Sequence, residues 1–121
     1  MDTILIIEDD SIMKEMLVRL LSEAGYQVTG VSDGAEALAL LTHNEYRLIV
    51  TDIVMPEKDG IEVIHFAKRN NRDLPIIAVS GGGRIGPGEY LSLAQKFGAD
   101  YTFEKPIDKE AFLGAVRECL M

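Results

Sequence analysis

The stretch Leu48–Gly60, LIVTDIVMPEKDG, decides the expected fold. Its first residues are apolar, as in strands that are covered on both faces of a sheet, and they lead directly into Asp52. Proline and glycine then interrupt the pattern, and Asp59 and Glu62 have the spacing of a helix-capping box. The stretch therefore predicts a buried strand, an aspartate displayed at its end, and a following helix.

The same alternation of a short apolar segment and a segment of helical period recurs along the chain. The expected strands are ILII (4–7), QVTGV (27–31), LIV (48–50), PIIAV (75–79) and YTF (101–103). The expected helices are Ile12 to Ala24 closed by Gly25, one after Asp33, one after Asp59, one through Leu91, Ala94 and Phe97 closed by Gly98, and one after Asp108. Five βα units predict a doubly wound α/β fold with a parallel sheet and helices on both faces.

Length and composition limit the classes of protein to which the chain can belong. At 121 residues the chain can form one domain with a single core. Its net charge of -8 argues against nucleic acid and anionic membranes as main partners. No apolar stretch approaches the ~18 residues of a membrane span, and the single Cys119 rules out an internal disulfide. We therefore expect one cytoplasmic domain over residues 1–121, with no output domain.

Polar residues gather where the expected strands end. They are Glu8, Asp9 and Asp10 after the first strand, Asp52 after the third, Ser80 after the fourth, and Glu104 and Lys105 after the fifth. In doubly wound sheets, ligands bind at the carboxyl ends of the strands. These residues are therefore predicted to form a site at one edge of the sheet.

The residue types at this edge favour phosphoryl transfer. If the first and third strands are neighbours, Glu8, Asp9 and Asp52 converge, and their repulsion calls for a cation. Mg²⁺ suits carboxylate ligands and leaves room for phosphate oxygens, whereas zinc and copper prefer His or Cys. Lys105 adds a positive charge and Ser80 a hydroxyl donor, so the set suits formation of an acyl phosphate on Asp52.

Four motifs, in order along the whole chain, resemble a known family. ILIIEDD, VTDIVMPEKDG, IIAVSGG and GADYTFEKPI are similar to the motifs of receiver domains of two-component response regulators, the CheY-like family. The resemblance implies a flavodoxin-like (βα)5 sandwich with strand order 2-1-3-4-5. It also implies that Asp52 accepts a phosphoryl group from a sensor histidine kinase or a histidine phosphotransfer protein, and that phosphorylation switches contacts with a downstream protein effector.

The resemblance also implies a metal site. Glu8 and Asp9 would hold Mg²⁺ together with Asp52, Glu8 through a water molecule, and the backbone carbonyl of Val54 would be a further ligand. Asp10 is interpreted as a favourable charge at the start of the first helix and not as a ligand.

Two further residues take switching roles by resemblance. Lys105 would pair with Asp52 before phosphorylation and with the phosphoryl oxygens afterwards, and the Lys105–Pro106 bond would be cis. Ser80 would donate a hydrogen bond to the phosphoryl group and draw the following loop inward.

Two features depart from the family pattern. Thr102 occupies the position of the usual switch aromatic, and Tyr101, one residue earlier on a strand, is expected on the opposite face of the sheet. The loop SGGGRIGPGEY (80–90) is longer than the family norm, and we expect it to reshape partner recognition.

Two other function classes stay open at this point. A small Mg²⁺-dependent aspartyl phosphohydrolase would also use Asp52 as nucleophile, although such enzymes usually have a second aspartate where Val54 stands. A flavodoxin-like binding module would use a phosphate loop after the first strand, where this chain has the acidic EDDS. The preferred interpretation is a stand-alone signalling receiver whose only catalytic activities are its own phosphorylation and slow dephosphorylation.

Overall fold

Five parallel strands form one sheet in the order β2-β1-β3-β4-β5. The computed structural model describes residues 3–53, 60–81, 92, 95–96 and 98–121. The strands are β1 (Thr3–Ile7), β2 (Gln27–Val31), β3 (Leu48–Asp52), β4 (Ile76–Ser80) and β5 (Tyr101–Glu104). The predicted doubly wound fold and its strand order are confirmed, and each strand ends within two residues of its predicted limits.

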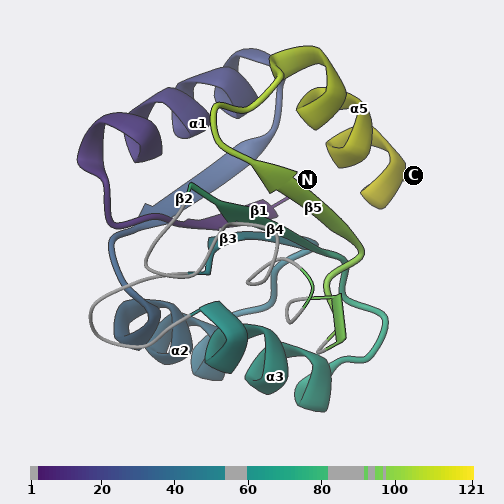
Figure 1. Cartoon of the computed structure of the whole chain (residues 1–121). Coiled ribbons are helices and arrows are strands. Elements are labelled where there is room, and N and C mark those ends of the chain that lie inside the picture. Colours follow the sequence, from purple (N-terminus) through teal and green to yellow (C-terminus); the bar gives the residue numbers. More distant parts are fainter. Residues whose placement is uncertain (1–2, 54–59, 82–91, 93–94, 97) are drawn as a thin grey trace.

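Helices cover both faces of the sheet (Figure 1). The described helices with assigned bounds are α1 (Ser11–Glu23), α2 (Gly34–His43), α3 (Gly60–Asn70) and α5 (Lys109–Cys119). Figure 1 shows α1 and α5 together on one face, and α2 and α3 together on the other. The predicted fourth helix rests on Leu91, Ala94 and Phe97, which lie outside the described residues, as does most of the loop 80–90.

Aspartate side chains cap three helices. Asp10 accepts hydrogen bonds from the backbone N–H groups of Ile12 and Met13 at 3.0 and 3.3 Å, Asp33 caps α2, and Asp108 caps α5. A cap of this kind stabilises a helix by about 1 kcal/mol. The helix starts predicted after Asp33 and Asp108 are confirmed, whereas the predicted cap Asp59 lies outside the described residues.

The core consists of two clusters separated by the sheet. All five residues of β3 and of β4 are buried, which explains their nearly continuous apolar sequences. The cluster under α1 and α5 includes Ile4, Ile6, Leu17, Leu21, Val50 and Phe112. The cluster under α2 and α3 includes Leu5, Ile7, Ile49, Val63, Ile64 and Ala78. Within the described ranges, none of the helices is long and apolar enough to cross a membrane.

The two residues at the start of β5 point to opposite faces of the sheet, as predicted. Tyr101 packs against the cluster under α1 and α5, and its hydroxyl donates a hydrogen bond to the Glu118 carboxylate. Thr102 is in register with Ala78, which belongs to the other cluster. Because alternate residues of a strand share a face, Thr102 lies on the same face as Ala78 and Ser80.

Candidate functional site

The carboxyl edge of the sheet brings the predicted site residues together. Asp52 is the last residue of β3, and Glu8 directly follows the neighbouring β1. Ser80 is the last residue of β4, and Lys105 directly follows β5. The strand order therefore places all four at one edge of the sheet. Asp52 is in the middle, Glu8 lies on its β1 side, and Ser80 and Lys105 lie on its β4 side. Val54 lies outside the described residues.

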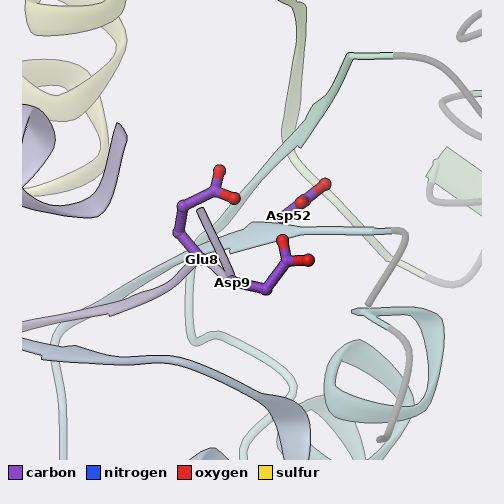
Figure 2. A group of neighbouring side chains, drawn as sticks. All are labelled: Glu8, Asp9 and Asp52. Carbon is purple, nitrogen blue, oxygen red and sulfur yellow. The ribbon is translucent and has the colours of Figure 1, made fainter. Parts of the chain in front are cut away.

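Three carboxylates converge at this edge. One carboxylate oxygen from each of Glu8, Asp9 and Asp52 lies within 4.8 Å of the others. Figure 2 shows the three side chains turned toward a common space. Glu8 and Asp52 are buried, whereas Asp9 is exposed. Carboxylate oxygens are the ligands that Mg²⁺ and other hard cations prefer, and three at this spacing fit such an ion.

Lys105 lies between two of these acids. Its Nζ atom is 2.8 Å from Glu8 Oε1 and 3.6 Å from Asp52 Oδ2. Burial lowers the pKa of Lys105, but the hydrogen bond to Glu8 and the charge of Asp52 outweigh it, so the pKa is raised. The lysine therefore stays charged, and it contacts Glu8 more closely than Asp52.

The surroundings of Asp52 disfavour its ionised form. Burial raises its pKa most, the negative charge of Glu8 raises it further, and Lys105 only partly offsets both, so the pKa is about 7. A cation at the carboxylates would favour the ionised, nucleophilic form of Asp52. The residues present therefore fit a divalent metal chemically as well as geometrically.

Glu8 and Asp10 also organise the backbone at the start of α1. The backbone N–H of Asp10 donates a hydrogen bond to Glu8 Oε2 at 3.1 Å. The Asp10 side chain is occupied with capping α1, which supports the interpretation that Asp10 is a helix cap and not a metal ligand.

Ser80 has an unusual hydroxyl. Its side chain is fully buried, and across the described part of the chain it alone has a buried side-chain oxygen that lacks a hydrogen-bond partner. An unpaired buried group of this kind lowers the free energy of unfolding by about 1–3 kcal/mol. The backbone N–H of Lys105 donates a hydrogen bond to the carbonyl oxygen of Ser80 at 3.0 Å, and the Lys105–Pro106 peptide bond is cis.

The sequence analysis did not predict that two glycines, Gly60 and Gly81, lie against residues of the site. A Cβ atom on Gly60 would lie 2.3 Å from the carbonyl oxygen of Asp52, and one on Gly81 would lie 2.8 Å from Lys105 Cδ. Both glycines leave room for a residue of the site. The sequence shows that Gly60 begins α3 and that Gly81 directly follows β4. It does not show that these glycines contact the Asp52 backbone and the Lys105 side chain, because those contacts depend on how distant segments pack.

Comparison with known proteins agrees with this geometry. A family profile described as "Response regulator receiver domain" matches residues 4–117. The response regulator receiver protein CpdR of Brucella abortus is 44% identical over 81 residues, which cover 67% of this chain and 68% of CpdR. Response regulator MprA of a Mycobacterium species is 36% identical over 117 residues, covering 97% of this chain and 50% of MprA. The chain thus spans about half the length of MprA.

Solved structures show the same architecture. A CheY-like response regulator receiver domain protein from Methanospirillum hungatei matches with a TM-score of 0.90 and 26% identity, over 99% of this chain and 94% of that one. Response regulator TrrA of Thermotoga maritima, solved in complex with Mg²⁺–BeF, matches with a TM-score of 0.86 and 28% identity, over 99% of this chain and 100% of TrrA. The chain therefore belongs to the response regulator receiver domain family of two-component signalling.

Proposed function

We propose that the domain is a Mg²⁺-dependent phosphoacceptor whose phosphorylated residue is Asp52. The observation that carries this proposal is the placement of one buried carboxylate between two further acids and a lysine at a single edge of the sheet. A sensor histidine kinase or a histidine phosphotransfer protein would donate the phosphoryl group. TrrA, a structural relative solved with Mg²⁺–BeF, supports the choice of metal.

The chain's own residues have distinct tasks in this transfer. A carboxylate oxygen of Asp52 attacks the phosphorus, the P–N bond to the donor histidine breaks, and the imidazole nitrogen keeps the electron pair and takes up a proton. The product is an acyl phosphate on Asp52. Mg²⁺ held by Glu8, Asp9 and Asp52, with the Val54 carbonyl as a further ligand, would neutralise charge on the phosphoryl oxygens.

Lys105 and Ser80 fit the needs of the phosphorylated state. Lys105 Nζ, already 3.6 Å from Asp52 Oδ2, would pair with phosphoryl oxygens on that residue. The Ser80 hydroxyl, which has no partner within the described ranges, would gain one by donating to the phosphoryl group. Phosphorylation would thereby favour a different position of the loop after β4.

The signal would leave the domain through contacts with a downstream protein effector. The net charge of -8 supports a protein partner over nucleic acid or an anionic membrane surface. The loop 80–90 begins at Ser80, so we propose that it contributes to recognition of that partner, in a cytoplasmic signalling role.

Intact-protein mass after incubation with acetyl phosphate tests the proposed function. We expect a gain of one phosphoryl group that requires Mg²⁺ and disappears in Asp52→Asn. Asp100→Asn, the same change directly before β5 and at the opposite end of the strands, is the matched control and should be phosphorylated like the wild type. Phosphorylation of Asp52→Asn to the same level would contradict the proposal, and repeated turnover of an aryl phosphate would favour the aspartyl phosphohydrolase instead.

A further inference from the structure

The charged side chains are divided unequally between the two ends of the sheet. Each helix connects parallel strands by running back across the sheet, so the helices begin at the carboxyl ends of the strands and finish at the amino ends. The described residues at the amino ends nearly balance in charge: Glu23, Glu45, Asp73, Asp100 and Glu118 against Arg47, Lys68, Arg69, Arg72, Lys96 and Arg117. The excess of acids in the described part of the chain therefore lies at the carboxyl edge.

Acidic residues lie around the three carboxylates of the site. They occupy the starts of helices or the end of β5, and all are exposed except Asp33, which is partly buried. These described residues form the acidic rim: Asp10, Asp33, Glu36, Glu62, Glu104, Asp108 and Glu110. Lys14 and Lys109 oppose them at the same edge, and the Lys14 ammonium already donates a hydrogen bond to the Ser32 hydroxyl at 2.7 Å.

The acidic rim, more than the site itself, sets the charge that an incoming phosphodonor meets. With a divalent cation bound, the three carboxylates and Lys105 would together carry no net charge, and the excess of rim acids would remain. Charges of this kind act over about 10 Å in 0.1 M salt. Charged groups of one sign around a site change association rates by about 10- to 1,000-fold.

Two features other than charge mark this edge as a binding surface. The fully buried Ser80 hydroxyl, at the same edge as Asp52, has no hydrogen-bond partner within the described ranges. Ile12, the second residue of α1, is 79% exposed. A protein partner, unlike a small ion, would cover Ile12 and could span the acidic rim from α2 to α5.

We infer that the acidic rim selects the phosphodonor by charge, and that it fits a protein whose phosphohistidine is surrounded by a basic surface. The inference rests on the proposed function for the group that is transferred. Opposite charges on the donor and the rim would speed their encounter, whereas an anionic donor would be repelled. The selection therefore appears in the rate of phosphorylation and is lost when salt screens the charges.

Two phosphohistidine peptides that differ only in charge test this inference. Lysines flank the histidine in one peptide and glutamates in the other, and both release the phosphoryl group by breaking the same kind of P–N bond. With saturating Mg²⁺ and about 0.05 M salt, we expect the lysine peptide to phosphorylate the domain at least about tenfold faster. At about 1 M salt, where charges act over only about 3 Å, the two rates should agree within about twofold. Equal rates at low salt would overturn the inference.

Matched double variants separate the position of the charge from its amount. Glu36→Gln with Glu110→Gln removes two acids of the rim. Glu23→Gln with Glu45→Gln removes two exposed acids at the amino ends and changes the net charge equally. The rim variant should lose severalfold in rate with the lysine peptide, whereas the control should keep the wild-type rate. An equal loss in both variants would overturn the inference.

NMR titration with the same peptides before phosphorylation gives a measurement that needs no phosphoryl transfer. At low salt the lysine peptide should shift amide resonances of rim residues, and the glutamate peptide should not. Equal binding of both peptides, or no binding of the lysine peptide, would overturn the inference. If the lysine peptide binds at the rim but neither peptide phosphorylates the protein, the proposed function fails and the selection by charge stands.

Discussion

Asp52 is buried and lies beside the carboxylate of Glu8, and each of these two conditions opposes its ionisation. The sequence predicted that Asp52, Glu8 and Asp9 would converge, because the carboxyl ends of neighbouring parallel strands meet at one edge. It could not predict that Lys105 would lie closer to Glu8 than to Asp52. That preference depends on side-chain rotamers and on the space above Gly81.

Replacing Asp52 by asparagine should change how stability depends on pH. The pKa of Asp52 is raised from 3.8 to about 7 by folding, so the folded protein binds the proton more tightly than the unfolded chain. The resulting contribution to stability is complete below about pH 4 and is lost as the pH rises through 7. The side chain of Asp52→Asn does not titrate. Between pH 4 and pH 8 the free energy of unfolding of this variant should therefore rise by roughly 2–4 kcal/mol relative to that of the wild type.

Urea unfolding at several pH values in the presence of a chelator checks this expectation. The wild type and Asp52→Asn should differ least near pH 4 and most near pH 8. A constant difference between the two proteins across this range would mean that burial and the charge of Glu8 do not raise the pKa of Asp52.

Gly60 permits a close approach of α3 to the end of β3. A Cβ atom there would lie 2.3 Å from the Asp52 carbonyl oxygen and 2.7 Å from Ile53 Cα, and both are backbone atoms that cannot move aside cheaply. We expect Gly60→Ala to destabilise the fold by about 1–3 kcal/mol and to weaken Mg²⁺-dependent phosphorylation. Gly114→Ala in α5, whose Cβ would have no atom nearer than 3.9 Å, is the matched control.

Urea unfolding of both glycine variants gives the comparison. Because alanine is the better helix former, Gly114→Ala should be as stable as the wild type or more so. If Gly60→Ala were equally stable and equally phosphorylated, the close contact with the Asp52 backbone would have no consequence.

At the scale of helices and strands, the sequence was most informative where burial is complete. The central strands β1, β3 and β4 have nearly uninterrupted Ile, Leu and Val because helices cover both of their faces. Aspartate caps marked the starts of α2 and α5 for a local reason, since a cap bonds only to the next turn. Contacts between distant elements, such as Lys68 with Asp100, left no comparable local pattern.

Asp100 ties the segment before β5 to β4 and to α3. One of its carboxylate oxygens accepts the backbone N–H of Ile76 at 2.9 Å and pairs with Lys68 Nζ at 3.3 Å. Asp100→Ala removes the acceptor of a part-buried N–H, so we expect a loss of about 1–2 kcal/mol in the free energy of unfolding. Asp100→Asn keeps one carbonyl acceptor and should lose less. Equal stability of the alanine variant and the wild type in thermal unfolding would contradict this role.

Tyr101 should not respond to phosphorylation. Its ring lies on the face of the sheet away from Ser80, and its hydroxyl is bonded to Glu118 on α5, which raises its pKa to about 12. We expect the ring resonances of Tyr101 in NMR spectra to stay in place when Asp52 is phosphorylated, and Tyr101→Phe to be phosphorylated like the wild type. A change of the Tyr101 rotamer between the two states would contradict this expectation.

For the whole molecule, the sheet separates two tasks. Its two faces hold the apolar clusters that stabilise the fold, and its carboxyl edge holds charged and polar groups that a core could not accommodate. The edge is therefore the place where a cation and, on the proposed function, a phosphoryl group would bind without disturbing the core. This division is a property of the doubly wound topology, which sequence periodicity predicted as a whole.

The most direct test of the central claim is chemical mapping of the phosphorylated residue. After incubation with acetyl phosphate and Mg²⁺, borohydride reduces an acyl phosphate of aspartate to homoserine, and peptide mass spectrometry locates the product. We predict homoserine at position 52 alone, with none when Mg²⁺ is chelated. Modification at Glu8 or Asp9, or a borohydride-resistant phosphate on Ser80, would contradict the assignment of Asp52 as the phosphoacceptor.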